Sequence, residues 1–286
     1  MNDTILVTGA TGTVGSQVVK KLAEIGANVR AAVRSTSKAE KLSGVEVVEF
    51  DLNKPETVQS AFTGIDKLFL ATPLVANMVE LDATSLEAAK KAGVKHIVRL
   101  SVMGADGEPA NPLCKLHREV EKMIESSGLA YTILRPNSFY QNYITFTGGT
   151  IKSQNAFYLP LGDAKLSLVD TRDIAAVAAA ALTEEGHEGK TYLVTGSEAL
   201  DNKQIADIFS SVLGRTIQYV DVPEDAAREG MKEAGMPEPE MNLVLGLYAD
   251  QKAGKYSNVS PVVEQITGKK PISFDQFAKD YAEAFK

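Results

Sequence analysis

The chain has 286 residues, of which 44% are hydrophobic and 23% are charged, and its formal net charge is −7. This acidic balance disfavours nucleic-acid phosphates and anionic membranes as partners, and a single cysteine excludes an internal disulfide and a four-cysteine metal site. No apolar stretch reaches the roughly 18 residues of a membrane span and no signal-type segment is found, so a soluble, cytoplasmic protein is expected.

The first half of the chain alternates short apolar runs with amphipathic segments. Strands are expected at 4–8, 28–34, 45–50, 67–72, 95–102 and 130–136, and helices at 13–26, 54–64, 76–93 and 112–127. Nearly continuous apolar strands that alternate with helices are typical of a parallel sheet covered on both faces. The sequence therefore predicts a Rossmann-type, doubly wound α/β fold whose main body is residues 1–136.

After residue 136 the alternation loosens. An aromatic helix is expected at 137–146, further helices at 171–184 and 202–214, and strands at 190–196 and 217–222. No linker rich in glycine, serine or proline separates the two halves. We therefore interpret 137–286 as a smaller C-terminal α/β portion, with segments that return to the main body, within a single unit.

The segment "VTGATGTVG" joins the first expected strand to the first expected helix. Its glycines have the spacing G-x-x-G-x-x-G, which permits a tight turn, close approach of a ligand to the backbone, and close helix–strand packing. The helix N-terminus would face a pyrophosphate with free N–H groups and a positive dipole end. This context predicts dinucleotide binding, and a glycine-rich turn without a ligand is the alternative. The expected contacts are Gly9, Ala10, Thr11, Gly12, Thr13, Val14 and Gly15.

The end of the second strand indicates which dinucleotide is preferred. An Asp or Glu about 20 residues after the loop would bond a ribose 2′-hydroxyl, but the chain has Arg34 there and Lys38 one turn later. A guanidinium pairs with a 2′-phosphate through two hydrogen bonds, which predicts a preference for NADP(H) over NAD(H). The alternative is that Arg34 and Lys38 are solvated surface charges with no role in cofactor binding. Asp51, which is followed by Leu52 after the third strand, is expected either to bond the adenine amino group or to cap a turn.

With these residues placed, the sequence resembles the atypical short-chain dehydrogenases/reductases, and within them the NmrA-like family. The segments "VTGATGTVG", "VRSTSK", "AGVKHIVRLSVMGAD", "SGLAYTILRPNSFYQN" and "VDTRDIAAVAAAAL" are similar to that family's recurring pattern. Two later segments, "TEEGHEGKTY" and "AGMPEPE", resemble its triphenylmethane reductase and NAD(P)H:quinone oxidoreductase branch. The resemblance covers nearly the whole chain, and it implies a Rossmann fold, a nicotinamide cofactor and a substrate bound on the side of the C-terminal portion.

The resemblance also implies which residues surround the nicotinamide and the substrate. Ligands in such sheets lie beyond the carboxyl ends of the strands, and the residues after the fourth, fifth and sixth strands lie at that edge. The expected cofactor contacts there are Thr72, Pro73, Ser101, Val102, Pro136 and Asn137. The expected substrate-pocket residues are Leu74, Met103, Phe139, Tyr140 and Tyr143, whose aromatic members either stack on a flat ligand or belong to the core.

Typical members of the superfamily carry a Tyr-x-x-x-Lys pair on the helix after the fifth strand. Here the tyrosine position corresponds to Leu113 and the lysine position to His117. His117 is the candidate catalytic residue: it would contact the nicotinamide ribose, face the substrate or supply a proton, and a packing histidine is the alternative. Cys114 is interpreted as a small buried side chain rather than a nucleophile. His96 is expected to be structural and His187 to lie on the surface, and no metal-site spacing is found.

Loss of the tyrosine affects which acceptor can be reduced. A ketone needs protonation of its developing alkoxide, whereas quinones, cationic triarylmethane dyes and conjugated imines or enones spread the arriving charge or begin positive. We therefore predict an NADPH-dependent reductase of quinone-like, dye-like or conjugated aromatic small molecules, as a monomer or a homodimer. A non-catalytic NADP(H)-binding redox sensor of the NmrA type is the alternative.

Overall fold

The computed structural model of the chain describes residues 3–35, 44–108 and 110–286. The predicted cofactor residue Lys38 therefore lies outside the described residues. The chain divides into two units, each made of three separate stretches of sequence. Unit 1 comprises the residues up to Val102, Leu116–Arg135 and Thr171–Leu193, and unit 2 comprises Met103–Lys115, Pro136–Asp170 and Val194–Lys286.

The centre of unit 1 is a seven-stranded sheet with the strand order β3-β2-β1-β4-β5-β6-β8. Strands β1 to β6 pair in parallel, and the order reverses between β1 and β4, so that these two strands lie side by side. This arrangement confirms the predicted doubly wound α/β fold, in which ligands bind beyond the carboxyl ends of the strands at the reversal. The strands are β1 Thr4–Val7, β2 Asn28–Val33, β3 Glu46–Glu49, β4 Lys67–Leu70, β5 His96–Leu100, β6 Ala130–Pro136 and β8 Lys190–Val194.

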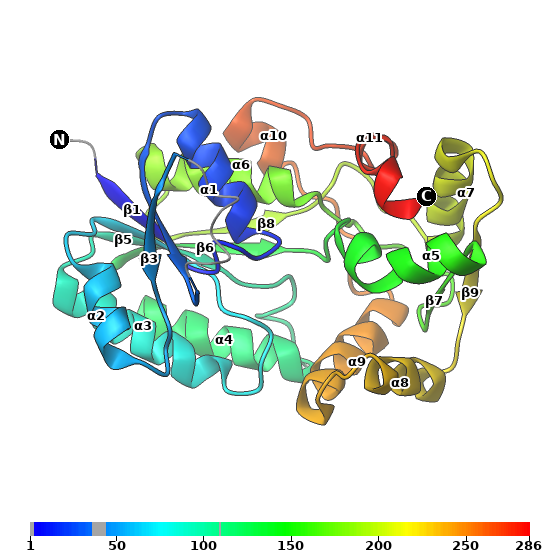
Figure 1. The fold of residues 1–286 in the computed structure, drawn as a ribbon, viewed down its shortest axis with the longest axis horizontal. Coiled ribbons are helices and arrows are strands. Elements are labelled where there is room, and N and C mark those ends of the chain that lie inside the picture. The colour runs from blue at the N-terminus through cyan, green and yellow to red at the C-terminus, as the bar shows by residue number, and fades with distance from the viewer. Residues whose placement is uncertain (1–2, 36–43, 109) are drawn as a thin grey trace. The chain divides into compact units, whose positions relative to one another are not determined.

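Helices cover both faces of this sheet (Figure 1). Helices α1 and α6 pack together on one face, and α2, α3 and α4 lie on the other. The core on the second face joins strand residues such as Leu6 and Ile97 to helix residues such as Phe62, Leu86 and Ile124. The five helices are α1 Gly15–Glu24, α2 Pro55–Phe62, α3 Met78–Ala92, α4 Pro112–Glu125 and α6 Thr171–Thr183.

Unit 2 is built around an aromatic core and a two-stranded parallel sheet, in which β7 pairs with β9. The ring of Tyr143 packs edge-on against Phe157, Phe209 and Phe274, with centroid distances of 5.6, 5.8 and 5.4 Å. Its elements are the π-helix η2 Tyr143–Thr147, α5 Gly148–Gln154, β7 Ala156–Leu159, α7 Asn202–Leu213, β9 Gln218–Asp221, α8 Glu224–Glu233, α9 Glu238–Lys252, α10 Val262–Thr267, α11 Phe274–Asp280 and the 3₁₀-helix η3 Ala282–Phe285.

Local sequence determines the C-terminal end of α3 and the N-terminal end of α7. Helix α3 ends at Gly93, whose φ of 74° is left-handed and therefore favours glycine. Helix α7 begins with a capping box, because the Asp201 carboxylate accepts from the Gln204 N–H and the Gln204 side chain accepts from the Asp201 N–H. Both ends agree with the predicted bounds.

The segment 137–146 differs from its predicted helix. Phe139 forms an isolated parallel bridge with Val169, and the Tyr140 N–H donates to the Val169 carbonyl at 3.0 Å. This main-chain pairing holds the first part of the segment in an extended conformation, and the π-helix begins only at Tyr143. The aromatic pattern of the segment reflects burial in unit 2 rather than a continuous helix.

Candidate functional site

The glycine turn between β1 and α1 is packed too closely for side chains. Gly9 has a φ of +60°, and a Cβ there would lie 3.2 Å from the Ala71 carbonyl oxygen at the end of β4. A Cβ on Gly15 would lie 2.2 Å from the Gly9 carbonyl oxygen, which is well inside van der Waals contact. The Gly12 N–H donates to the same carbonyl at 2.8 Å. Glycine is therefore required at both ends of this turn, which lies at the reversal of the strand order.

The N-terminus of α1 is open to an anionic ligand. Its N-cap residue Val14 offers no side-chain hydrogen bond, and the first turn carries no acidic residue. Thr11, Gly12 and Thr13 are exposed at this end, whereas Ala10 is buried beneath them. Uncapped N–H groups and the positive end of the helix dipole suit a phosphate group at this position.

The residues after β2 and β3 lie close enough to interact. Arg34 is exposed, and Asp51 is half-buried. Asp51 Oδ1 accepts from the Asn53 backbone N–H at 3.0 Å and from Asn53 Nδ2 at 3.1 Å. These bonds lower the pKa of Asp51, with smaller contributions from the charges of Lys54 and Arg34. Asp51 is therefore an ionised turn cap that has only a weak electrostatic interaction with Arg34, and Leu52 packs on the core of unit 1.

A buried ion pair supports the residue that follows β4. Arg99 on β5 donates to Asp82 on α3 at 2.7 Å, and both side chains are 1% exposed. The Thr72 hydroxyl donates to the other oxygen of the Asp82 carboxylate. Thr72 is thus tied to the sheet through Asp82, while Pro73 and Leu74 beyond it are exposed. A charge pair at this depth holds the loop in one geometry.

A second buried carboxylate supports the residue that follows β5. The Ser101 hydroxyl donates to Glu121 Oε1 at 2.6 Å, and Arg135 Nε donates to the same oxygen at 2.9 Å. Arg135 Nη2 and Arg118 Nη1 donate to Oε2 at 2.7 and 3.0 Å. Burial would raise the pKa of Glu121, but the bonds from Arg135 and Ser101 outweigh it and lower that pKa. Glu121 is therefore ionised, and the Ser101 hydroxyl proton is held by it. Val102 follows, half-buried.

His117 lies one helical turn before Glu121 on α4. It is half-buried, but its Nδ1 is shielded from solvent and has no hydrogen-bond partner among the residues that the structure describes. Burial, together with the positive charge of Arg99, lowers the pKa of His117 well below its usual value. The imidazole is therefore neutral near pH 7, which disfavours the interpretation of His117 as a proton donor.

The predicted substrate residues of unit 2 do not share one environment. Phe139 and Tyr143 line a small pocket with Ser138, Asn142, Phe146, Tyr248 and several leucines. Tyr140 is 1% exposed and packs edge-on against Phe274 at 5.0 Å, so it belongs to the core. Met103 is also buried.

Asn137 and Pro136, the predicted cofactor residues after β6, are buried. Asn137 Nδ2 donates to Ser167 Oγ and to the Tyr256 carbonyl, each at 2.9 Å, and its Oδ1 accepts from the Ser138 N–H. The Pro136 carbonyl accepts from the Met103 N–H at 2.8 Å. The polar side-chain atoms of Asn137 are thus already bonded within unit 2.

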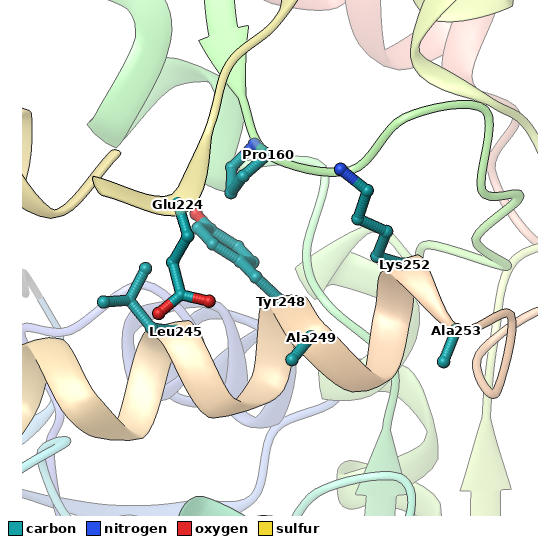
Figure 2. A pocket seen from close by; sticks show the side chains of 7 residues that line it. All are labelled: Pro160, Glu224, Leu245, Tyr248, Ala249, Lys252 and Ala253. Atoms are coloured by element: carbon teal, nitrogen blue, oxygen red, sulfur yellow. The ribbon is translucent and has the colours of Figure 1, made fainter. Parts of the chain in front are cut away.

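A larger pocket of about 420 Å³ lies on α9, and sequence analysis missed it. Figure 2 shows the ring of Tyr248 projecting from α9 into this pocket, which Glu224, Pro160 and Lys252 also line. Tyr248 lines the small pocket as well. Tyr248 and Lys252 have the spacing Tyr-x-x-x-Lys, and this spacing was the signal that could have pointed to them.

The remaining nucleophilic and titratable candidates are structural. The Cys114 thiol is buried, 3.6 Å from the Met103 carbonyl and 3.4 Å from Tyr256 Oη. His96 bonds Thr132 at 2.9 Å. His187 was expected on the surface, but it is buried, and its Nδ1 bonds Tyr192 Oη at 2.9 Å. Within residues 3–35, 44–108 and 110–286 no cluster of metal-ligating side chains is found, and no helix there could cross a membrane.

Several known proteins are similar to the chain over nearly its full length. A family model described as the NmrA-like family matches residues 1–277. An NAD(P)H azoreductase of Xenophilus azovorans is 39% identical over 283 residues, which cover 98% of this chain and 99% of that protein. The NADPH-dependent quinone oxidoreductase of Escherichia coli, complexed with NADPH, matches with a TM-score of 0.86 and 28% identity, over 98% of this chain and 99% of that one. The Citrobacter sp. triphenylmethane reductase complexed with NADP(H) matches with a TM-score of 0.84 and 31% identity, over 97% and 99%.

Proposed function

Because the chain belongs to the NmrA-like family, we propose that it is an NADPH-dependent reductase that transfers hydride to quinone-like, dye-like or other conjugated aromatic acceptors. The observation that carries this proposal is the tightly packed glycine turn with its uncapped helix N-terminus, followed by Arg34 where an NAD-specific site would carry an acid. The azoreductase, quinone oxidoreductase and triphenylmethane reductase relatives support the choice of acceptor class.

The cofactor would lie along the edge formed by the strand ends of unit 1. Residues 9–15 are proposed to bind the pyrophosphate, and Arg34 is proposed to pair with a 2′-phosphate. Lys38 stays a proposed second contact from the sequence pattern alone. Asp51 and Leu52 are proposed to hold the adenine. The bound cofactor supplies the hydride. The proposed contacts around its nicotinamide half are Thr72, Pro73, Ser101, Val102, Pro136 and Asn137.

The network behind Ser101 restricts what this edge can do to a substrate. The Ser101 proton is held by ionised Glu121, His117 is neutral, and Leu113 stands at the position of the usual tyrosine. These described residues therefore offer no acid ready to protonate an alkoxide near pH 7. Acceptors that delocalise the incoming charge, and take a proton from water afterwards, suit such a site better than simple ketones do. This is the reason to propose quinones and conjugated dyes as the substrate class.

The acceptor side is proposed to lie in unit 2. Phe139, Tyr143 and the exposed Phe146 present aromatic surface around the small pocket, which favours a flat ligand. Leu74 and Met103 remain proposed contacts of the acceptor, on the basis of the sequence pattern.

The test is stopped-flow absorbance at the NADPH band, after mixing the NADPH-loaded protein with menadione, an azo dye or a triarylmethane dye. Rapid oxidation with any of these acceptors, and little with an unconjugated ketone, is expected. NADPH that binds tightly but is oxidised by none of them would contradict the proposal. That result would favour the alternative of a redox sensor. A sensor is expected to bind NADP⁺ and NADPH with clearly different affinities.

A further inference from the structure

We propose that Tyr248 donates the hydrogen bond that orients the acceptor in the small pocket of unit 2, so that the preferred substrate carries a hydrogen-bond-accepting oxygen or nitrogen on its aromatic system. This inference rests on the proposed function, because it assumes that the small pocket receives the molecule to be reduced. It adds a specificity residue on α9, far along the chain from the helix that usually carries the tyrosine.

Tyr248 occupies the wall between two cavities. It lines the small pocket together with Phe139 and Phe146, and it also lines the large pocket with Glu224 and Lys252 (Figure 2). The small pocket measures about 50 Å³, which admits the edge of an aromatic ring but not a whole ring system. The rest of a flat ligand would lie against Phe146, which is 62% exposed at the rim.

Part of the wall of the small pocket has an unusual backbone. Tyr143, Phe146 and Thr147 are presented by the π-helix η2 rather than by a regular α-helix. Such π-turns are rare and often occur at functional sites, because the extra residue alters the direction of the side chains around it.

The polar side chains around the small pocket are mostly committed to partners. Tyr143 Oη donates to Asn202 Oδ1 at 2.6 Å, and Gln251 Nε2 donates to Ser138 Oγ at 2.8 Å. Tyr248 Oη, by contrast, forms no hydrogen bond with any residue in the part of the chain that the structure describes. Tyr248 is half-buried, and its hydroxyl is not among the unpaired polar atoms that are fully shielded from solvent. Water can therefore reach this hydroxyl, and a ligand atom that accepts a hydrogen bond from it would replace that water without breaking a bond to another described residue.

The chemistry of Tyr248 is donation without proton transfer. Burial raises the pKa of Tyr248 to about 12, so its hydroxyl stays protonated in the neutral range. Lys252 has the spacing of the usual Tyr-x-x-x-Lys pair, but it is half-exposed and interacts with Asp221 at 3.6 Å. In that arrangement the lysine does not lower the pKa of the tyrosine. The phenol can therefore hold a carbonyl oxygen or an azo nitrogen in place while water supplies the proton later.

This role separates two classes of acceptor. A quinone carbonyl or an azo nitrogen has a lone pair that accepts from Tyr248. The cation of a triarylmethane dye receives hydride at carbon, and its nitrogen lone pairs are delocalised into the cation. Removal of the hydroxyl should therefore weaken quinone binding and leave dye binding nearly unchanged.

The experiment measures menadione and malachite green affinity by calorimetry on NADP⁺-loaded protein, in which no turnover occurs. Tyr248→Phe is expected to raise the Kd for menadione about 3- to 10-fold, the loss of one neutral hydrogen bond, with the dye Kd unchanged. The matched control is Tyr158→Phe, because Tyr158 is a surface tyrosine whose hydroxyl donates to Gln154 at 2.8 Å and which lines neither pocket. Ala249→Leu narrows the large pocket only, and it should leave both affinities as they are.

Equal menadione affinity in Tyr248→Phe and wild type would overturn the proposal. An equal loss for both ligands would overturn it as well, because it would indicate a steric or structural effect. A loss in Ala249→Leu would place the ligand in the large pocket, and a loss in Asn142→Ala alone would assign the donor role to that amide. Wild type that binds menadione but never oxidises NADPH would refute the proposed reductase and leave the role of Tyr248 standing.

Discussion

Asp82→Asn tests the ion pair beneath the β4 loop. The substitution keeps the shape of the side chain and its ability to accept from Thr72, but it removes the negative charge that balances Arg99. Both members of the pair are 1% exposed, so the guanidinium would remain buried without its counter-ion. Orphaning a buried charge costs about 3–5 kcal/mol, and for a chain of this size that lowers Tm by roughly 6–20 °C.

The measurement is thermal unfolding of the two variants Asp82→Asn and Asp275→Asn. Asp275 and Lys279 form a pair at 2.6 Å whose side chains are 51% and 57% exposed, so its loss should cost about 0–1 kcal/mol. The double variant Asp82→Leu/Arg99→Met removes both charges and should recover part of the stability that Asp82→Asn loses. If Asp82→Asn unfolds at the same temperature as Asp275→Asn, the buried Arg99–Asp82 pair does not stabilise the fold more than an exposed pair does.

Three further outcomes are expected. Arg34→Ala should weaken NADPH binding about 30- to 150-fold more than NADH binding, since it removes two charge-assisted bonds to the 2′-phosphate; equal losses would contradict that role. Gly15→Ala should abolish tight cofactor binding, because its Cβ would lie 2.2 Å from the Gly9 carbonyl oxygen. Its control is Gly230→Ala on α8, which has open space around it and should stabilise the protein by about 0.5–1 kcal/mol. The pKa of His117 is lowered in the folded state, so the unfolded chain takes up the proton at a higher pH. The free energy of unfolding should therefore fall below about pH 6.5, and His117 should contribute at most about 1.4 kcal/mol per pH unit to that fall. In denaturant titrations, His117→Gln should lose less stability between pH 7 and pH 5 than the wild type does.

The fold of unit 1 could be predicted because its signals are local. Apolar runs of four to seven residues alternate with amphipathic segments, and turn residues such as Gly93 mark where helices end. The same holds for the glycine turn, because close packing at Gly15 leaves glycine as the one residue that fits. The parallel sheet followed from these patterns, whereas the family was indicated by the resemblance of whole segments such as "VTGATGTVG" to the NmrA-like family.

The roles of site residues could not be predicted where they depend on partners that are distant in the sequence. Glu121 determines what Ser101 can donate, yet nothing in the sequence around either residue indicates that Arg135 joins them. Tyr140 and Tyr143 have similar sequence contexts, but one packs on Phe274 in the core and the other also lines a pocket. The helix predicted at 137–146 was wrong at its start because pairing with Val169, a non-local contact, overrides local preference.

Assembly of unit 1 depends on residues that are made late. Its sheet ends with β8, and α6 packs against α1. Both elements follow two stretches of unit 2 in the chain, Met103–Lys115 and Pro136–Asp170. At about 5–20 residues per second, the roughly 60 residues between the ends of β6 and β8 take about 3–12 s to synthesise. During this interval β6 is an unpaired edge, which is a template for association with another chain. A fragment that stops at residue 136 would keep that edge permanently, so we expect it to aggregate rather than fold as an independent nucleotide-binding module.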